Sequence, residues 1–183
     1  MNKTGTKEIE TERLILRRFR SEDAEDMYAN WASDPEVTRF LTWPPHQSVE
    51  VTKSILADWI PRYEEGGYFN WVMEYKETGK IIGNISVVKL DESIRAADMG
   101  YCMSRRYWGQ GLMPEALIAV MDYLFDEVGL DRVAASHDVN NPKSGRVMEK
   151  AGMKMEGILR AAGKNNLGIC DEVWHAMIRS DRG

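Results

Sequence analysis

The fold is decided by residues 98–117, which read Asp98-Met-Gly-Tyr-Cys-Met-Ser-Arg-Arg-Tyr-Trp-Gly-Gln-Gly-Leu-Met-Pro-Glu-Ala-Leu117. This stretch sets Arg106-x-x-Gly109-x-Gly111 between an apolar strand and an amphipathic helix. Two glycines one residue apart let a ligand phosphate come close to the backbone, and the N–H groups at the helix start then face it, helped by the helix dipole. Charge-assisted hydrogen bonds contribute roughly 1.5–3 kcal/mol each. The stretch therefore predicts a site for a phosphorylated cofactor.

The regions around this stretch carry alternating strand and helix patterns. Apolar alternation predicts strands, and an apolar residue every third or fourth position predicts helices. We expect strands over residues 13–18, 69–75, 80–90, 96–104, 132–137, 154–160 and 173–179, and helices over 21–31, 49–64, 112–128 and 141–151. Gly129 and Gly152 follow the last two helices, as a helix stop requires. This order predicts an α+β fold around a mixed sheet.

Length and composition describe an ordinary globular protein. The 183 residues are expected to form a single domain, residues 1–183, with residues 1–8 as a flexible N-terminus. A net charge of −5 argues against nonspecific binding of nucleic acid, which needs a basic face. Arg105, Arg106 and Arg146 remain candidates for a local basic pocket.

The cysteines, histidines and apolar runs bear on cellular location, metal binding and membrane insertion. Two cysteines are too few for a disulfide framework, which favours a cytoplasmic location. The three histidines and two cysteines show no ligand spacing, so we expect no metal. No apolar run reaches the length that spans a bilayer, and the N-terminus lacks the apolar segment of a signal peptide.

Three blocks of sequence occur in a characteristic order: Met99 through Ala116, Asn141-Pro-Lys-Ser144 with Val147 through Met153, and Glu156 through Arg160 followed by Asp171 and a closing strand. In these blocks the chain resembles the GNAT superfamily of acyl-CoA N-acyltransferases. The chain is most similar to the branch that contains the ribosomal-protein N-terminal acetyltransferases, the ribosomal-protein-alanine enzyme included. The resemblance implies a three-layer fold with a central, mostly antiparallel twisted sheet flanked by helices. It also implies a transferase that uses acetyl-CoA as co-substrate.

By this resemblance, one set of residues binds acetyl-CoA. The loop residues would hold the pyrophosphate mainly through backbone N–H groups, and the strand before the loop would pair with the pantetheine amides. The implied cofactor-binding residues are Tyr101, Cys102, Met103, Arg106, Gly109, Gln110, Gly111, Leu112, Met113, Asn141 and Ser144. Cys102 is interpreted as a small apolar residue rather than a nucleophile.

Asn141 and Ser144 are the implied catalytic residues, and each has a plainer interpretation. Asn141 precedes Pro142 and fits a helix N-cap, while the resemblance adds a contact to the pantetheine arm. Ser144 fits a second capping hydroxyl, or a proton donor to the departing CoA thiolate. A thiol has a pKa near 8.5, so a hydrogen bond to the thiolate can suffice.

The sequence leaves the general base unassigned. Some relatives carry a carboxylate just after the position of Arg160, but this chain reads Ala161-Ala-Gly163 there. The candidates are Glu74, Asp98, His137 and His175. An α-amine with a pKa near 8 is about one-tenth neutral at pH 7, whereas a lysine is neutral at about one part in a few thousand. An enzyme without a strong base therefore suits an α-amine or another weakly basic amine.

The acceptor is less well defined than the donor. Trp43 lies where this branch builds a wall of the acceptor pocket, and it could equally fill the core beneath the N-terminal helices. His175 stands where relatives commonly have Tyr, and it is the second candidate for substrate binding. We expect direct transfer of acetyl to a primary amine, either the N-terminal α-amine of a protein or peptide or a free small-molecule amine. A non-catalytic CoA-sensing or partner-binding module is the other alternative, and a homodimer is in keeping with the resemblance.

Overall fold

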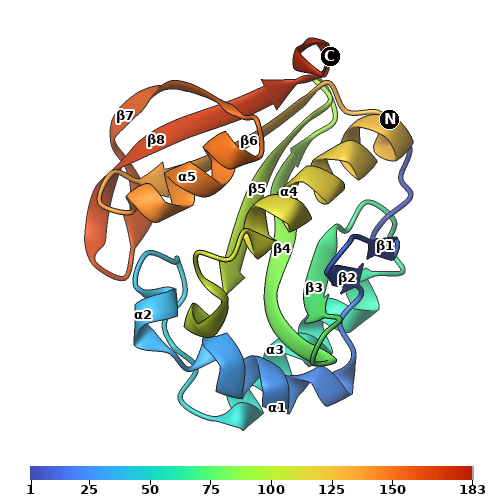
Figure 1. Cartoon of the computed structure of the whole chain (residues 1–183), viewed down its shortest axis with the longest axis vertical. Helices are drawn as coiled ribbons and strands as arrows, with labels where there is room; N and C mark the ends of the chain where they lie inside the picture. Colours follow the sequence, from blue (N-terminus) through green and yellow to red (C-terminus); the bar gives the residue numbers. More distant parts are fainter. Residues whose placement is uncertain (183) are drawn as a thin grey trace.

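A computed structural model describes residues 1–182, in which the strands form one sheet of order β1-β2-β3-β4-β5-β6-β8-β7 (Figure 1). The β5–β6 pair is parallel and the other pairs are antiparallel, which confirms the mixed α+β sheet. The strands are β1 (Ile9–Glu10), β2 (Leu14–Arg17), β3 (Asn70–Tyr75), β4 (Lys80–Asp91), β5 (Ala96–Met103), β6 (Arg132–Asp138), β7 (Lys154–Asn165) and β8 (Gly168–Ile178). The helices are α1 (Ala24–Met27), α2 (Pro35–Thr38), α3 (Val49–Arg62), α4 (Leu112–Tyr123) and α5 (Pro142–Lys150).

Helices cover the two faces of the sheet as separate layers. Side chains alternate along a strand, so Trp71 and Met73 of β3 join the core beneath α4 and α5, whereas Val72 joins the core beneath α1 and α3. Figure 1 shows α4 and α5 in front of the sheet and α1 and α3 at its lower end. This arrangement confirms the predicted layers of helix, sheet and helix.

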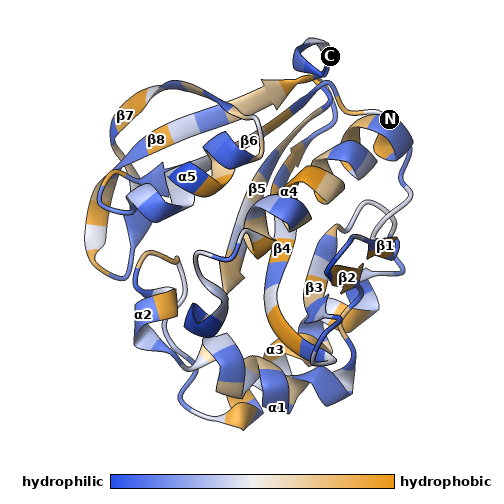
Figure 2. Cartoon of the chain, in the orientation of Figure 1, coloured by the Kyte–Doolittle hydropathy of each residue, from blue (hydrophilic) through white to orange (hydrophobic). Residues whose placement is uncertain are grey.

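The helix that follows the quoted stretch is central to the packing. Its side chains at Leu112, Ala116, Leu117 and Val120 are completely buried. Figure 2 shows α4 as largely apolar and α5 as mostly hydrophilic, in keeping with α5 covering the sheet with only one side. A π-helical turn, Leu124–Val128, continues α4 and ends at Gly129, whose φ of 83° fits the predicted stop.

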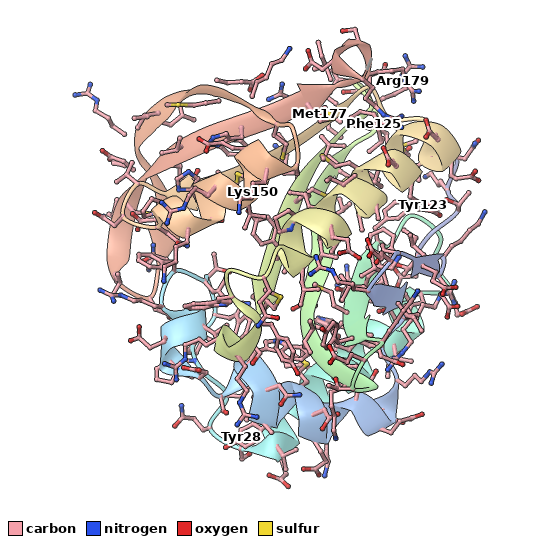
Figure 3. The ribbon with its side chains drawn as sticks, viewed as in Figure 1. Tyr28, Tyr123, Phe125, Lys150, Met177 and Arg179 are labelled. Carbon is pink, nitrogen blue, oxygen red and sulfur yellow. The ribbon has the colours of Figure 1, made fainter. Side chains whose placement is uncertain are left out.

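The N-terminal segment differs from the flexible one that was expected for residues 1–8. Thr6 is buried and its hydroxyl donates to the carbonyl of Tyr68 at 2.9 Å. Tyr123 of α4, labelled in Figure 3, donates to the carbonyl of Gly5 at 2.7 Å, and the indole of Trp71 donates to the carbonyl of Lys7. These bonds tie the segment to the core, a long-range effect that its polar composition does not reveal.

Several other elements differ from the prediction in extent. Strands β7 and β8 run to Asn165 and begin at Gly168, because the register shifts near Gly157 and Gly163 hide the alternation of a continuous hairpin. The two-residue strand β1 and the one-turn helix α2 were missed. Helix α2 has a local signature, because Asp34 caps it by accepting from the Glu36 N–H and Pro35 is its first residue.

Candidate active site

The central feature of the site is a gap between two parallel strands. Residues Ala96–Met99 of β5 pair with Arg132–Ala135 of β6, and beyond them the pairing stops. Each strand then continues with its outer neighbour only, β5 with β4 and β6 with β8. The carboxyl ends of β5 and β6 therefore diverge and leave one backbone edge of each strand unpaired.

The backbone of β5 presents alternate groups to this gap. The N–H of Ser104 donates to Ile82 of β4 at 2.8 Å, so by alternation the backbone of Cys102 also faces β4. The N–H groups of Tyr101 and Met103 then face the gap, and the Met103 carbonyl on that side accepts from the indole of Trp108. Two of the three predicted strand residues thus lie where an extended ligand could pair with them.

Cys102 is oriented away from the gap, contrary to its expected role in cofactor binding. Its thiol donates to Oδ1 of Asn84 at 3.0 Å and packs against the core under α1 and α3. Burial raises the pKa of this thiol to about 12, so little thiolate is present at neutral pH. This supports the interpretation of Cys102 as a structural residue and not a nucleophile.

The loop between β5 and α4 presents a run of backbone donors. Gly109 and Gly111 have φ values of 77° and 78°, which favour glycine. Among residues 1–182, the amides from Gly109 to Met113 donate no hydrogen bond to the protein. The side chains of Leu112 and Met113 are buried in the core, so these two residues can reach a ligand only through their backbone. An anion at this helix start would find both N–H donors and a favourable dipole.

One of the three arginines of the predicted basic pocket forms an ion pair within the described part of the chain, and the other two do not. Arg105 forms an ion pair with Asp34 at 2.6 Å, which withdraws it from the predicted basic pocket. Arg106 and Arg146 are exposed and form no ion pair within the described residues 1–182. Lys143 lies 5.2 Å from the centre of the Trp108 ring, so the start of α5 adjoins the loop.

Ser144 contacts the strand across the gap instead of capping its own helix. Its Oγ lies 3.0 Å from the hydroxyl of Tyr101, which also donates to the Ser144 carbonyl. Asn141 is the N-cap residue of α5, but its side chain makes no capping hydrogen bond. Burial raises the pKa of Tyr101, partly offset by the bond to Ser144, so the phenol stays protonated. Both Ser144 and Asn141 therefore keep polar atoms for a ligand at the start of α5.

The position of α5 depends on a close approach to β6. A Cβ atom placed on Gly145 would lie 2.6 Å from Nε2 of His137. Nδ1 of that ring is 2.8 Å from the carbonyl of Asp138, so the ring is held from both sides. Gly145 thus lets the helix that carries Ser144 settle directly onto the sheet.

His175 does not line an acceptor pocket in this structure. The residue is 2% exposed, its ring centre is 5.5 Å from that of His137, and neither ring nitrogen has a hydrogen-bond partner among residues 1–182. Burial, and secondly the neighbouring His137, lower its pKa, so the ring is neutral at pH 7. The substrate-binding prediction is corrected here because a position shared with relatives does not reveal burial beneath α5.

The remaining base candidates show no arrangement for proton removal. Glu74 is held by Arg17 at 2.8 Å. Burial raises the pKa of Asp98, but its side chain lies on the face of the sheet opposite Tyr101, because the two residues are three positions apart on β5 and side chains alternate along a strand. His137 is packed against Gly145. The base therefore stays unassigned.

A tether that the sequence did not reveal connects the acceptor side to the β7–β8 hairpin. Asn166, at the hairpin turn, donates its side-chain amide to the carbonyls of Thr38 and Trp43, each at 2.8 Å, and its N–H to that of Leu41. Figure 1 shows α2 close to this end of the hairpin. Trp43 is partly buried against the α1–α3 core, so it both fills that core and borders the loop.

Asp138 secures the same hairpin from the end of β6. Its carboxylate accepts from the N–H and side chain of Asn140 and from the side chain of Asn165 at 2.7 Å. Burial opposes ionisation of Asp138, but these hydrogen bonds outweigh it and lower its pKa. Asp138 thus acts as a fixed anchor, which its sequence context did not indicate.

Residues 1–182 contain neither a metal-binding cluster nor a membrane-spanning helix. No group of His, Cys, Asp and Glu side chains there is arranged to hold a metal ion. No helix in that range combines the length and apolar character needed to cross a bilayer.

Comparison with known proteins identifies the family. The acetyltransferase (GNAT) domain family matches residues 13–154. The uncharacterized N-acetyltransferase YoaA of Bacillus subtilis is 34% identical over 83% of this chain and 85% of its own length. The ribosomal-protein-serine acetyltransferase of Escherichia coli is 30% identical over 67% of this chain and 68% of its own.

A solved structure shares the whole arrangement. RimL, described as a ribosomal L7/L12 alpha-N-protein acetyltransferase in complex with coenzyme A, superposes with a TM-score of 0.83 at 22% identity, covering 94% of this chain and 98% of that one. This likeness confirms the three-layer fold. The family match and the relative YoaA show that the chain belongs to the GNAT family of N-acetyltransferases.

Proposed function

We propose that this enzyme transfers acetyl from acetyl-CoA directly to the N-terminal α-amine of a protein or peptide. One observation supports the donor half above all others. The unpartnered amides of Gly109 to Met113 lie at the start of α4, directly after the strand whose Tyr101 and Met103 N–H groups face the β5–β6 gap. Pyrophosphate, pantetheine and thioester would follow one another along this path.

The residues at the far end of the path suit the chemistry of acyl transfer. The Met103 or Tyr101 N–H would donate to the thioester oxygen, on which negative charge develops as the amine attacks the carbonyl carbon. When the C–S bond breaks, the Ser144 hydroxyl would donate to the departing thiolate. Tyr101, whose hydroxyl lies 3.0 Å from that of Ser144, would then turn its single proton from the Ser144 carbonyl to the Ser144 hydroxyl oxygen. No covalent enzyme intermediate is invoked, because no thiol or hydroxyl here has an activating base.

The lack of an arranged base favours an α-amine as acceptor. Glu74, His137 and His175 are engaged in structural contacts, so the amine must already be neutral when it attacks. An α-amine meets this condition far more often than a lysine side chain at pH 7. The description of RimL as an alpha-N-protein acetyltransferase supports the same acceptor class.

A thiol-release assay with matched peptides tests this proposal. One peptide carries a free N-terminus and no lysine, and its partner has a blocked N-terminus and one internal lysine. We expect CoA release and a single acetyl group on the first peptide only. Release with free amino acids or polyamines but with neither peptide would favour the small-molecule alternative. Tight CoA binding without release for any amine would favour a CoA-sensing module.

A further inference from the structure

The phosphate-binding loop is tied to the start of β2 by two charged residues. Nη1 of Arg13 donates to the carbonyl of Gln110 at 2.9 Å, and Nε donates to Oε2 of Glu115 at 2.7 Å. The backbone N–H of Arg13 and the hydroxyl of Thr11 both donate to Oε1 of Glu115, at 2.9 and 2.6 Å. A residue 97 positions away in sequence thus contacts the loop and the helix behind it.

The bond to Gln110 fixes the direction of a neighbouring donor. A trans peptide is planar, so its C=O and the next N–H point in opposite directions. Because Arg13 holds the Gln110 carbonyl, the N–H of Gly111 must point away from Arg13. Gly109 and Gly111 both have positive φ, and glycine alone would leave this peptide free to rotate. Arg13 removes that freedom.

The bond to Glu115 resolves a conflict of charge. Glu115 lies in the first turn of α4, where a diphosphate is expected. Burial opposes its ionisation, but the hydrogen bonds from Thr11 and Arg13 outweigh burial and lower its pKa, so it is anionic at neutral pH. A bare carboxylate at this point would repel the phosphates. The Arg13 guanidinium is the cation that pairs with it.

We propose that Arg13 is a positioning residue that sets the affinity for the phosphorylated half of CoA, by orienting the Gly111 N–H and by neutralising Glu115. This inference rests on the proposed use of the loop as the pyrophosphate site. It assigns Arg13 no contact with the reacting atoms.

Binding measurements on four variants and a control test the proposal. The variants are Arg13→Ala, Arg13→Lys, Glu115→Gln and the double variant R13A/E115Q, each titrated by calorimetry with CoA and by chemical shift with pantetheine, which lacks phosphate. The control is Arg182→Ala, which removes an arginine paired with Asp126 and Asp122 at the opposite end of the α4 region. Melting temperatures report on folding.

The expected pattern separates the two effects. Arg13→Ala weakens CoA binding by about tenfold, the equivalent of about 1.4 kcal/mol, and leaves pantetheine binding unchanged. The double variant R13A/E115Q regains the part of the lost CoA affinity that is due to the unpaired Glu115 charge. It does not regain the part that is due to the orientation of the Gly111 N–H. Arg13→Lys lies between wild type and Arg13→Ala, since lysine keeps the charge but lacks the rigid planar fork with which Nε and Nη1 of Arg13 hold Glu115 and Gln110. Arg182→Ala binds both ligands like the wild type.

Three results would overturn the inference. Arg13→Ala could bind CoA as the wild type does, or it could lose CoA and pantetheine to the same degree, which would indicate a merely structural residue. If Arg13→Ala does not fold, the test passes to Arg13→Lys. A folded Arg13→Lys that binds CoA with wild-type affinity would then also overturn the inference. Failure of the proposed pyrophosphate site gives a different result, because the wild-type protein itself would then not bind CoA. Failure of the proposed acetyl transfer would appear only in the thiol-release assay and would leave these binding constants unchanged.

Discussion

Gly145→Ala is the substitution whose outcome the structure defines most sharply. Glycine inside a helix is less stable than alanine by about 0.5–1 kcal/mol, so on helix propensity alone the variant would gain stability. The new Cβ, however, would lie 2.6 Å from Nε2 of His137. That ring cannot simply turn aside, because its Nδ1 is bonded to the Asp138 carbonyl and its other face adjoins His175.

The clash should outweigh the gain in propensity. Overpacking a well-filled site costs about 1–3 kcal/mol, so we expect a net loss of about 1 kcal/mol, or about 2–4 °C in melting temperature for a chain of this size. Because the displaced helix carries Asn141 and Ser144, acetyl-CoA should also bind more weakly. Calorimetric melting and CoA titration measure the two effects.

A second background makes the test specific. In His137→Ala the ring is gone, so adding Gly145→Ala should then raise stability by the propensity difference. We therefore expect Gly145→Ala to lower the free energy of unfolding in the wild-type protein and to raise it in His137→Ala. If Gly145→Ala stabilises the protein in both and leaves CoA affinity intact, the close contact between α5 and β6 does not position the site.

Three further predictions concern single side chains. His175→Phe removes two buried ring nitrogens that have no partner, so unfolding in urea at pH 7 should require about 1 kcal/mol more. The lowered pKa of His175 means that the unfolded chain takes up a proton first, so wild-type stability falls below the ordinary histidine pKa of 6.5, and the variant should lose that part of the pH dependence. Ser144→Ala should lower kcat by about 10–100-fold, the loss of one hydrogen bond to a thiolate, with KM for acetyl-CoA little changed; an unchanged kcat would leave Ser144 without its role. Asn166→Ala removes the two side-chain hydrogen bonds to the loop that carries Trp43 and keeps the backbone bond to Leu41, so KM for the amine should rise while CoA affinity stays constant, and a change in CoA affinity alone would contradict this.

Local sequence patterns made the strand, loop and helix around the glycines predictable. Gly109 and Gly111 sit between a strand pattern and a helix pattern, and both adopt a positive φ that favours glycine. Gly129 ends the same helix for the same reason. These features depend on neighbours in sequence, which is why one sequence suffices to find them.

Contacts between distant segments could not be predicted in this way. The Tyr101–Ser144 hydrogen bond joins residues 43 positions apart, and the Asn166 tether to Trp43 joins residues 123 apart. His175 was assigned to the substrate by its place in a family pattern, yet only the packing of α5 reveals that it is buried. Helix α2 is a different case, because Asp34 and Pro35 form a local N-cap pattern from which the start of this helix is predictable.

A crystal structure with acetyl-CoA bound tests the central claim most directly. The account predicts pyrophosphate oxygens within hydrogen-bond distance of the Gly109 to Met113 amides, pantetheine along the open edge of β5, and the thioester beside Ser144. Phosphates bound elsewhere, with those amides still facing solvent, would contradict it.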